Sequence, residues 1–166
     1  MYRLHRIFCA TAWEAEGERR AFHDTLGQFN ETQGIPAGTL YVPVSLVNIH
    51  DKRPYQYTVE ENIRACRYYI LVPADGWGSP ERAFERDYRL ALACAADPAL
   101  PMQQAVMLVR TQPDGSPSPF AATLDAAALP YTPFTTIDDF QQALLRILPA
   151  WLAADSAPSG SDAVSA

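Results

Sequence analysis

The sequence lacks the residue patterns of disulfide-rich, zinc-binding and phosphate-loop proteins. It has three cysteines, an odd number at wide spacing, and three histidines that form no paired-ligand spacing with them. We therefore expect reduced, mostly buried thiols at Cys9, Cys66 and Cys94, and we assign no metal ligands. Neither a G-x-G-x-x-G nor a Walker pattern is present, so the glycine cradle of dinucleotide and P-loop folds is absent.

Positive charge and long apolar runs are also scarce. The net charge is -6, so the chain lacks the excess of positive charge that binds nucleic acid or an anionic membrane, and we expect neither as a partner. The N-terminal "MYRLHRIFCA" has too short an apolar run for a signal peptide or a membrane span. The expected location is the cytoplasm.

What the sequence does contain is an alternation of strand-like and helix-like segments. At 166 residues the chain has the usual size of one domain, which we place at residues 1–153, followed by a disordered polar tail at 154–166. β-Branched and aromatic runs predict strands at residues 4–11, 39–47, 67–74, 104–110 and 129–134. Helical periodicity and capping signals predict helices at residues 13–33, 58–66 and 79–96, and from 136 onward, and a small alanine-rich segment lies at 123–128.

This alternation predicts an α/β fold with three layers, in which helices cover both faces of a five-stranded, mostly parallel sheet. We expect the flavodoxin-like strand order 2-1-3-4-5. Pro43 cannot donate a ladder hydrogen bond, which suits a second strand at the sheet edge. In such sheets ligands bind beyond the carboxyl ends of the strands, near the switch point between strands 1 and 3.

One segment that reaches this rim is "PADGWGSPERAFERDYRLALA", residues 73–93. Ser79-Pro80-Glu81 has the composition of a helix start. The helical wheel then places Phe84, Tyr88 and Leu92 on the core face and Glu85 and Asp87 at its two edges. Glu85 has two interpretations: it pairs with Arg89 one turn on, or its carboxylate reaches a ribose hydroxyl.

The residues before this helix also have alternative interpretations. Trp77 either stacks on a base or nicotinamide ring or closes the top of the core. Gly78 allows a close backbone approach or a positive φ, and Asp75 either contacts a ligand or caps the turn.

The other rim segments are the first strand-to-helix turn and a polar loop. Thr11, Ala12 and Trp13 form the turn, where backbone N–H groups can receive a ligand. Lys52 and Arg53 lie in the loop "HDKRPYQY", where they either meet a phosphate or are simply exposed. Glu18, Arg19 and Arg20 are interpreted as a solvated charged face.

Together, "FCATAWEAEGERRAF" and "TVEENIRACRYYILVPADGWGSPERAFERDYRLALA" resemble the TIR-like superfamily. The likeness is greatest to the bacterial domain of unknown function number 4062 group. Features typical of that group fall on Thr11, Glu18-Arg19, Trp77-Gly78 and Glu85-x-Asp87-Tyr88. The outline is also similar to that of nucleoside 2-deoxyribosyltransferases.

The resemblance implies a nucleotide-binding domain that cleaves the N-glycosidic bond of NAD or a related nucleotide and requires no further cofactor. Glu85 would be the carboxylate at the ribose, Asp87 the second choice, and Trp77 the platform for the base. TIR-type activity also implies self-assembly. The alternatives are a non-catalytic module that assembles with itself or with a protein partner, and a nucleoside deoxyribosyltransferase.

Overall fold

Strands form where the sequence has its apolar, β-branched runs. The computed structural model describes residues 1–44, 55–78 and 83–157. Its five-stranded sheet has the order β2-β1-β3-β4-β5, and every neighbouring pair is parallel. The strands are β1 (Arg3–Thr11), β2 (Thr39–Pro43), β3 (Tyr68–Val72), β4 (Gln104–Arg110) and β5 (Thr132–Phe134). The predicted flavodoxin-like order, with the proline-containing strand at an edge, is confirmed.

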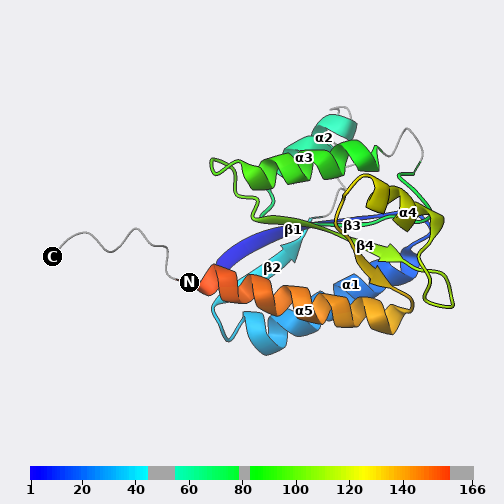
Figure 1. The fold of residues 1–166 in the computed structure, drawn as a ribbon. Coiled ribbons are helices and arrows are strands. Elements are labelled where there is room, and N and C mark those ends of the chain that lie inside the picture. Colours follow the sequence, from blue (N-terminus) through cyan, green and yellow to red (C-terminus); the bar gives the residue numbers. More distant parts are fainter. Residues whose placement is uncertain (45–54, 79–82, 158–166) are drawn as a thin grey trace.

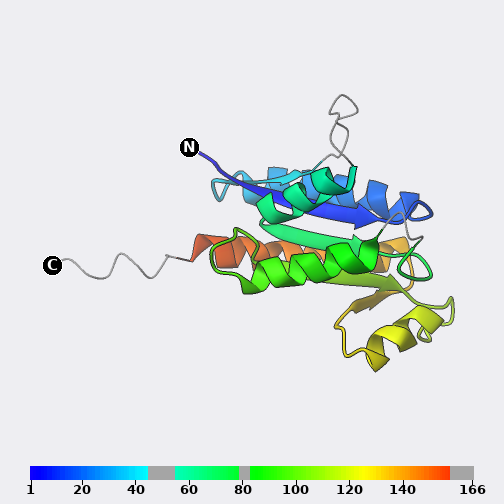
Figure 2. The same cartoon turned by 90° about the horizontal axis from the view of Figure 1, so that it is seen from above.

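Helices cover both faces of this sheet. α1 (Glu16–Phe29) and α5 (Ile137–Ser156) pack together on one face, and α2 (Tyr55–Ala65) and α3 (Phe84–Ala96) pack together on the other (Figure 1). The short α4 (Pro119–Ala126) lies near the β5 edge (Figure 2). None of the helices in the described part of the chain is long and apolar enough to cross a membrane.

Helix starts differ from the sequence prediction more than strand positions do. α1 begins at Glu16 because residues 12–15 form a turn, in which the N–H of Ala15 donates to the carbonyl of Ala12. α2 begins at Tyr55, so Thr58 lies inside the helix and is not its cap. α3 begins at Phe84, later than predicted, and the expected start at residues 79–81 lies outside the described residues.

The start of α3 has an unusual backbone conformation. Ala83 stands at the N-cap with φ 48° and ψ 33°, in the left-handed region, and its side chain supplies no capping hydrogen bond. A left-handed residue interrupts a right-handed helix, so the helix can extend only from Phe84 onward.

A π-helical turn follows α1 and protects the β2 edge. This turn, η1 (Asn30–Gly34), replaces the last residues of the predicted helix. The Asn30 side chain donates to the carbonyl of Tyr41 at 2.8 Å and accepts from its N–H at 3.0 Å. The amide group therefore takes the place of a neighbouring strand at the middle of β2, which shields the backbone of an edge strand.

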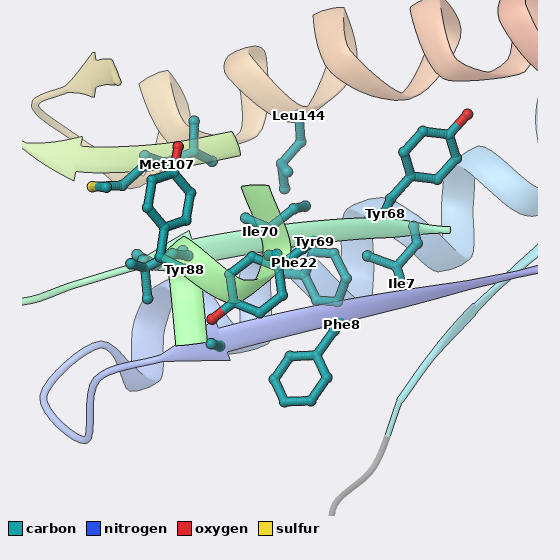
Figure 3. Packing of buried hydrophobic residues seen from close by; sticks show 14 of the residues in the cluster. Ile7, Phe8, Phe22, Tyr68, Tyr69, Ile70, Tyr88, Met107 and Leu144 are labelled. Atoms are coloured by element: carbon teal, nitrogen blue, oxygen red, sulfur yellow. The ribbon is translucent and has the colours of Figure 1, made fainter. Parts of the chain in front are cut away.

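The central strand β3 is buried on both faces, as predicted from its uninterrupted apolar run. Figure 3 shows Ile70 beneath Leu144 of α5. The rings of Tyr69 and Phe8 are stacked, with their centroids 5.3 Å apart. Tyr68 stacks on Trp151 of α5 with ring centroids 4.0 Å apart. These contacts fix the sheet between its helical layers.

All three cysteines are free, as expected.

The last helix extends further than the sequence indicates. Its capping box at Thr136 and Asp139 is confirmed, but the helix continues past Pro149 to Ser156. The predicted disordered tail from residue 154 therefore begins too early. The reason is Asp155, whose carboxylate is fully buried and accepts hydrogen bonds from Arg67 Nε at 2.5 Å and the Tyr41 hydroxyl at 2.8 Å.

The end of α4 offers a simple stability prediction. Ala128 has φ 54°, and the N–H of Leu129 bonds back to the carbonyl of Leu124, a helix-ending turn in which glycine is usual. We expect Ala128→Gly to raise the free energy of unfolding by about 0.5–1 kcal/mol, because glycine removes the left-handed strain. Ala126→Gly, at the last residue of the same helix, should instead lower it by about 0.5–1 kcal/mol. Urea denaturation of both variants tests the pair, and a loss of stability in Ala128→Gly would contradict the prediction.

Candidate functional site

The carboxyl ends of β1, β3 and β4 meet at one rim of the sheet, where the predicted switch point lies. The N–H of Ala12 donates to the carbonyl of Val72 at 3.0 Å, which holds the two strand ends together. Arg19 reaches back from α1 and donates to the Thr11 hydroxyl at 2.9 Å and to the Ala12 carbonyl at 3.3 Å. Arg19 therefore fixes the turn between β1 and α1.

A hollow of about 340 Å³ opens directly above this turn. We call it the switch-point hollow. It brings together four residues predicted from sequence, Ala12, Trp13, Asp75 and Gly78, and adds four others, Glu14, Ala74, Gly76 and Phe84. Gly78 has φ 82°, a conformation that favours glycine. An open hollow thus lies at the β1/β3 switch point, and its described lining includes the carboxylates of Glu14 and Asp75.

A second, more open depression of about 530 Å³ lies beside the first, at the start of α3. We call it the α3 groove. Its described lining is Trp77, Gly78, Ala83, Phe84, Glu85, Arg86 and Arg89. Gly78 and Phe84 line both depressions, so the two are neighbours along the rim. An extended ligand can therefore occupy both.

Glu85 makes the pair with Arg89 that its first interpretation predicts, and its side chain also lines the α3 groove. It pairs with Arg89 on the same helix, with hydrogen bonds of 3.1 Å and 2.9 Å to one carboxylate oxygen, as the helical spacing predicts. It also lines the α3 groove, and about half of its side chain (47 %) is exposed there. A carboxylate that is paired on one side and open on the other can accept hydrogen bonds from a ligand.

Trp77 lies between the core and the groove. Its ring meets that of Phe120 edge-on at 5.2 Å and lies 6.5 Å from that of Tyr88. The interpretation in which Trp77 closes the top of the core is therefore confirmed. Trp13 differs: its side chain is 75 % exposed beside the switch-point hollow. Of the two rim tryptophans, Trp13 has the freer ring.

Glu18 lies in an environment that the sequence does not indicate. Instead of lying on a solvated face it is 1 % exposed, and its Oε1 accepts a hydrogen bond from Arg110 at the end of β4. Glu18 and Arg110 line a small hollow of about 90 Å³, which also includes Glu14, Ala74 and Asp75 from the switch-point hollow. The resemblance singled out Glu18-Arg19, but nothing local in the sequence indicates burial.

Some of the residues predicted for the site do not line the switch-point hollow or the α3 groove. Thr11 is buried at 8 % exposure, bonds to Arg19 and lines none of the three depressions. Asp87 was expected at the edge of the core face but is buried at 5 % exposure. Burial raises the pKa of Tyr69 well above its ordinary value, and the nearby charge of Asp87 adds to the rise. Lys52 and Arg53 lie outside the described residues.

The charges along the rim are unevenly distributed. Glu14 and Asp75 line the switch-point hollow, and none of its described lining residues is a cation. The α3 groove carries Arg86 and Arg89 beside Glu85. Within residues 1–44, 55–78 and 83–157, no three His, Cys, Asp or Glu side chains form a group that could hold a metal ion. Among the described residues, the switch-point hollow is therefore lined by acids, and the α3 groove is lined by two arginines and one acid.

Comparisons with protein-family models and with curated proteins found no match to this sequence.

Proposed function

We propose that the rim binds NAD or a closely related nucleotide and cleaves its N-glycosidic bond. The nicotinamide ring would occupy the switch-point hollow, and the ribose would extend past Phe84 toward Glu85 in the α3 groove. The observation that carries this proposal is the adjacency of an acid-lined hollow and a groove with a half-exposed carboxylate.

The charge of the two depressions supports this orientation. The oxidised nicotinamide ring is a cation, and Glu14 and Asp75 give the switch-point hollow negative charge. The pyrophosphate is an anion, and Arg86 and Arg89 line the neighbouring α3 groove. The exposed ring of Trp13 can stack on a flat cationic ring at the mouth of the hollow.

The proposed reaction needs few protein groups. The bond between C1′ of the ribose and the ring nitrogen breaks, and its electron pair leaves with neutral nicotinamide. Water adds to C1′ and one proton is released. The transition state resembles an oxocarbenium ion, so a carboxylate beside the ribose stabilises its positive charge and holds its hydroxyls. Glu85 is the described residue of the groove that can supply this carboxylate.

Comparing oxidised with reduced NAD tests the binding step. We expect NAD to bind about fivefold or more tightly than NADH, whose ring is neutral, because a unit charge near carboxylates is worth about 1 kcal/mol even in a watery site. Asp75→Asn should shrink this preference. Asp24→Asn, which removes the same charge from the exposed face of α1, should leave it unchanged. Isothermal titration calorimetry measures all three, and equal affinities in the wild type would contradict the proposal.

The main alternative is a module that assembles with itself or with a protein, and the exposed Trp13 ring is the observation that favours it. Sedimentation at rising protein concentration separates the two functions. Association that Trp13→Ala abolishes, in a protein that binds neither NAD nor NADH, would favour the alternative.

A further inference from the structure

Among the described residues, only one of the two carboxylate oxygens of the buried Glu18 has a hydrogen-bond partner. Its side chain is 2 % exposed, and Oε1 accepts a hydrogen bond from Arg110. Oε2 is buried and has no hydrogen-bond partner among the described residues. Leaving a buried acceptor unsatisfied costs about 1–3 kcal/mol, and more for a charged group, so such an atom calls for an explanation.

The surroundings of this oxygen form a distinct small site. Glu18 lines the hollow of about 90 Å³ with Arg110 and with Glu14, Ala74 and Asp75, the last three of which also line the switch-point hollow. A group attached to a ligand in the larger hollow can therefore enter the smaller one. At about 30 Å³ for each water molecule of the liquid, the space suits a substituent of a few atoms.

The chemistry of this site distinguishes between substituents. An ionised Glu18 carboxylate can only accept hydrogen bonds at Oε2, and its partner Arg110 can only donate them. The guanidinium carries five N–H donors, and Arg110 is about half exposed, so it has donors beyond the one that Glu18 takes. A fitting group thus presents an N–H donor beside a carbonyl acceptor.

We propose that the small hollow recognises a primary carboxamide on the ring bound in the switch-point hollow, with Glu18 and Arg110 as the residues that select it. The amide N–H donates to Glu18 Oε2, and the amide oxygen accepts from the Arg110 guanidinium. This assignment rests on the proposed function and names the group that determines ligand specificity. A dinucleotide whose ring bears a carboxylate in place of the amide should bind more weakly. A carboxylate has no N–H to donate, and it would place a second negative charge against Glu18.

Binding of NAD and of nicotinic acid adenine dinucleotide, its carboxylate analogue, tests this assignment. We expect the wild type to bind NAD at least about tenfold more tightly, because a site built to accept a hydrogen bond from the ligand rejects an analogue that lacks the donor. Glu18→Gln keeps the size of the side chain but loses the charge and adds an N–H donor. This variant should bind the acid analogue more tightly than the wild type does and bring the two affinities within about threefold.

A matched control and a stability measurement keep these outcomes separate. Glu16→Gln makes the same change two residues earlier, on a side chain that is 77 % exposed, and should keep the wild-type preference. If Glu18→Gln does not fold, as judged by thermal unfolding, the wild-type comparison alone decides. NAD binding without preference for the amide would overturn the carboxamide site but leave the proposed function standing. If neither dinucleotide binds, both are wrong.

Discussion

Replacing Asp155 with alanine is expected to lower the free energy of unfolding by about 3–5 kcal/mol, the usual cost of breaking a buried ion pair from one side. The Asp155 carboxylate is fully buried and accepts from Arg67 Nε and from the Tyr41 hydroxyl. Its backbone carbonyl accepts from Arg3 at 2.5 Å. One residue of α5 therefore ties the helix to β1 and β2 and to Arg67, just before β3.

His5 also lies beside the Asp155 carboxylate. The ring nitrogen Nε2 lies 3.5 Å from the Asp155 carboxylate, but burial lowers the pKa of His5 below its ordinary value, despite the opposing effect of Asp155. The imidazole is thus mainly neutral at pH 7. Arg67 is the cation that pairs directly with the Asp155 carboxylate, so removing the carboxylate takes the ion-pair partner from a partly buried guanidinium.

Urea denaturation of Asp155→Ala measures the loss. Asp155→Asn, which keeps an acceptor oxygen, should lose less, and Asp24→Ala, on an exposed face, should change stability by about 0.5 kcal/mol or less. Ending the chain after Ala153, the domain boundary that the sequence predicts, removes Asp155 and should cost at least as much as the alanine substitution. Stability within about 0.5 kcal/mol of the wild type in Asp155→Ala would show that the cluster is not a support of the fold.

The second large effect is expected in catalysis. Glu85→Gln should reduce nicotinamide release from NAD by about 100-fold or more, because it removes the charge that stabilises an oxocarbenium-like transition state. Folding should be almost unaffected. The pair with Arg89 is exposed and lies on one helix, where such pairs contribute only about 0.3–0.5 kcal/mol.

Glu16→Gln is the matched control for this variant. Glu16 makes the same kind of pair with Arg20 four residues on, at 3.9 Å, and lines none of the three depressions. The two variants should therefore lose similar, small amounts of stability, while Glu85→Gln alone loses activity. Release of nicotinamide at equal rates by wild type and Glu85→Gln would remove Glu85 from the proposed mechanism.

The strands and their order could be predicted because their signals are local. A short apolar run such as that of β3 indicates a buried strand, and Pro43 indicates an edge. The position of the candidate site could be predicted from the strand order, since parallel strands present their carboxyl ends at one rim. Ala12, Asp75 and Gly78 are therefore at the expected place.

The buried charges could not be predicted in the same way. Glu18 bonds to Arg110, and Asp155 bonds to Arg67, across 92 and 88 positions of sequence. A helical wheel shows which residues share a face, but burial of a charge depends on a partner that another element supplies. Asp87 belongs to the same class, since the wheel placed it at an edge and the packing of α3 buries it.

If NAD binds with its nicotinamide ring in the switch-point hollow, as we propose, its position on the protein can be measured. In a two-dimensional 15N nuclear magnetic resonance titration, NAD should shift the backbone amide signals of Ala12, Gly76 and Gly78 and the indole signal of Trp13. These residues line the hollow. Residues at the opposite end of the strands, around Asp155, should not respond. NAD binding that leaves the signals of the hollow in place, or no binding at millimolar NAD, would contradict the account.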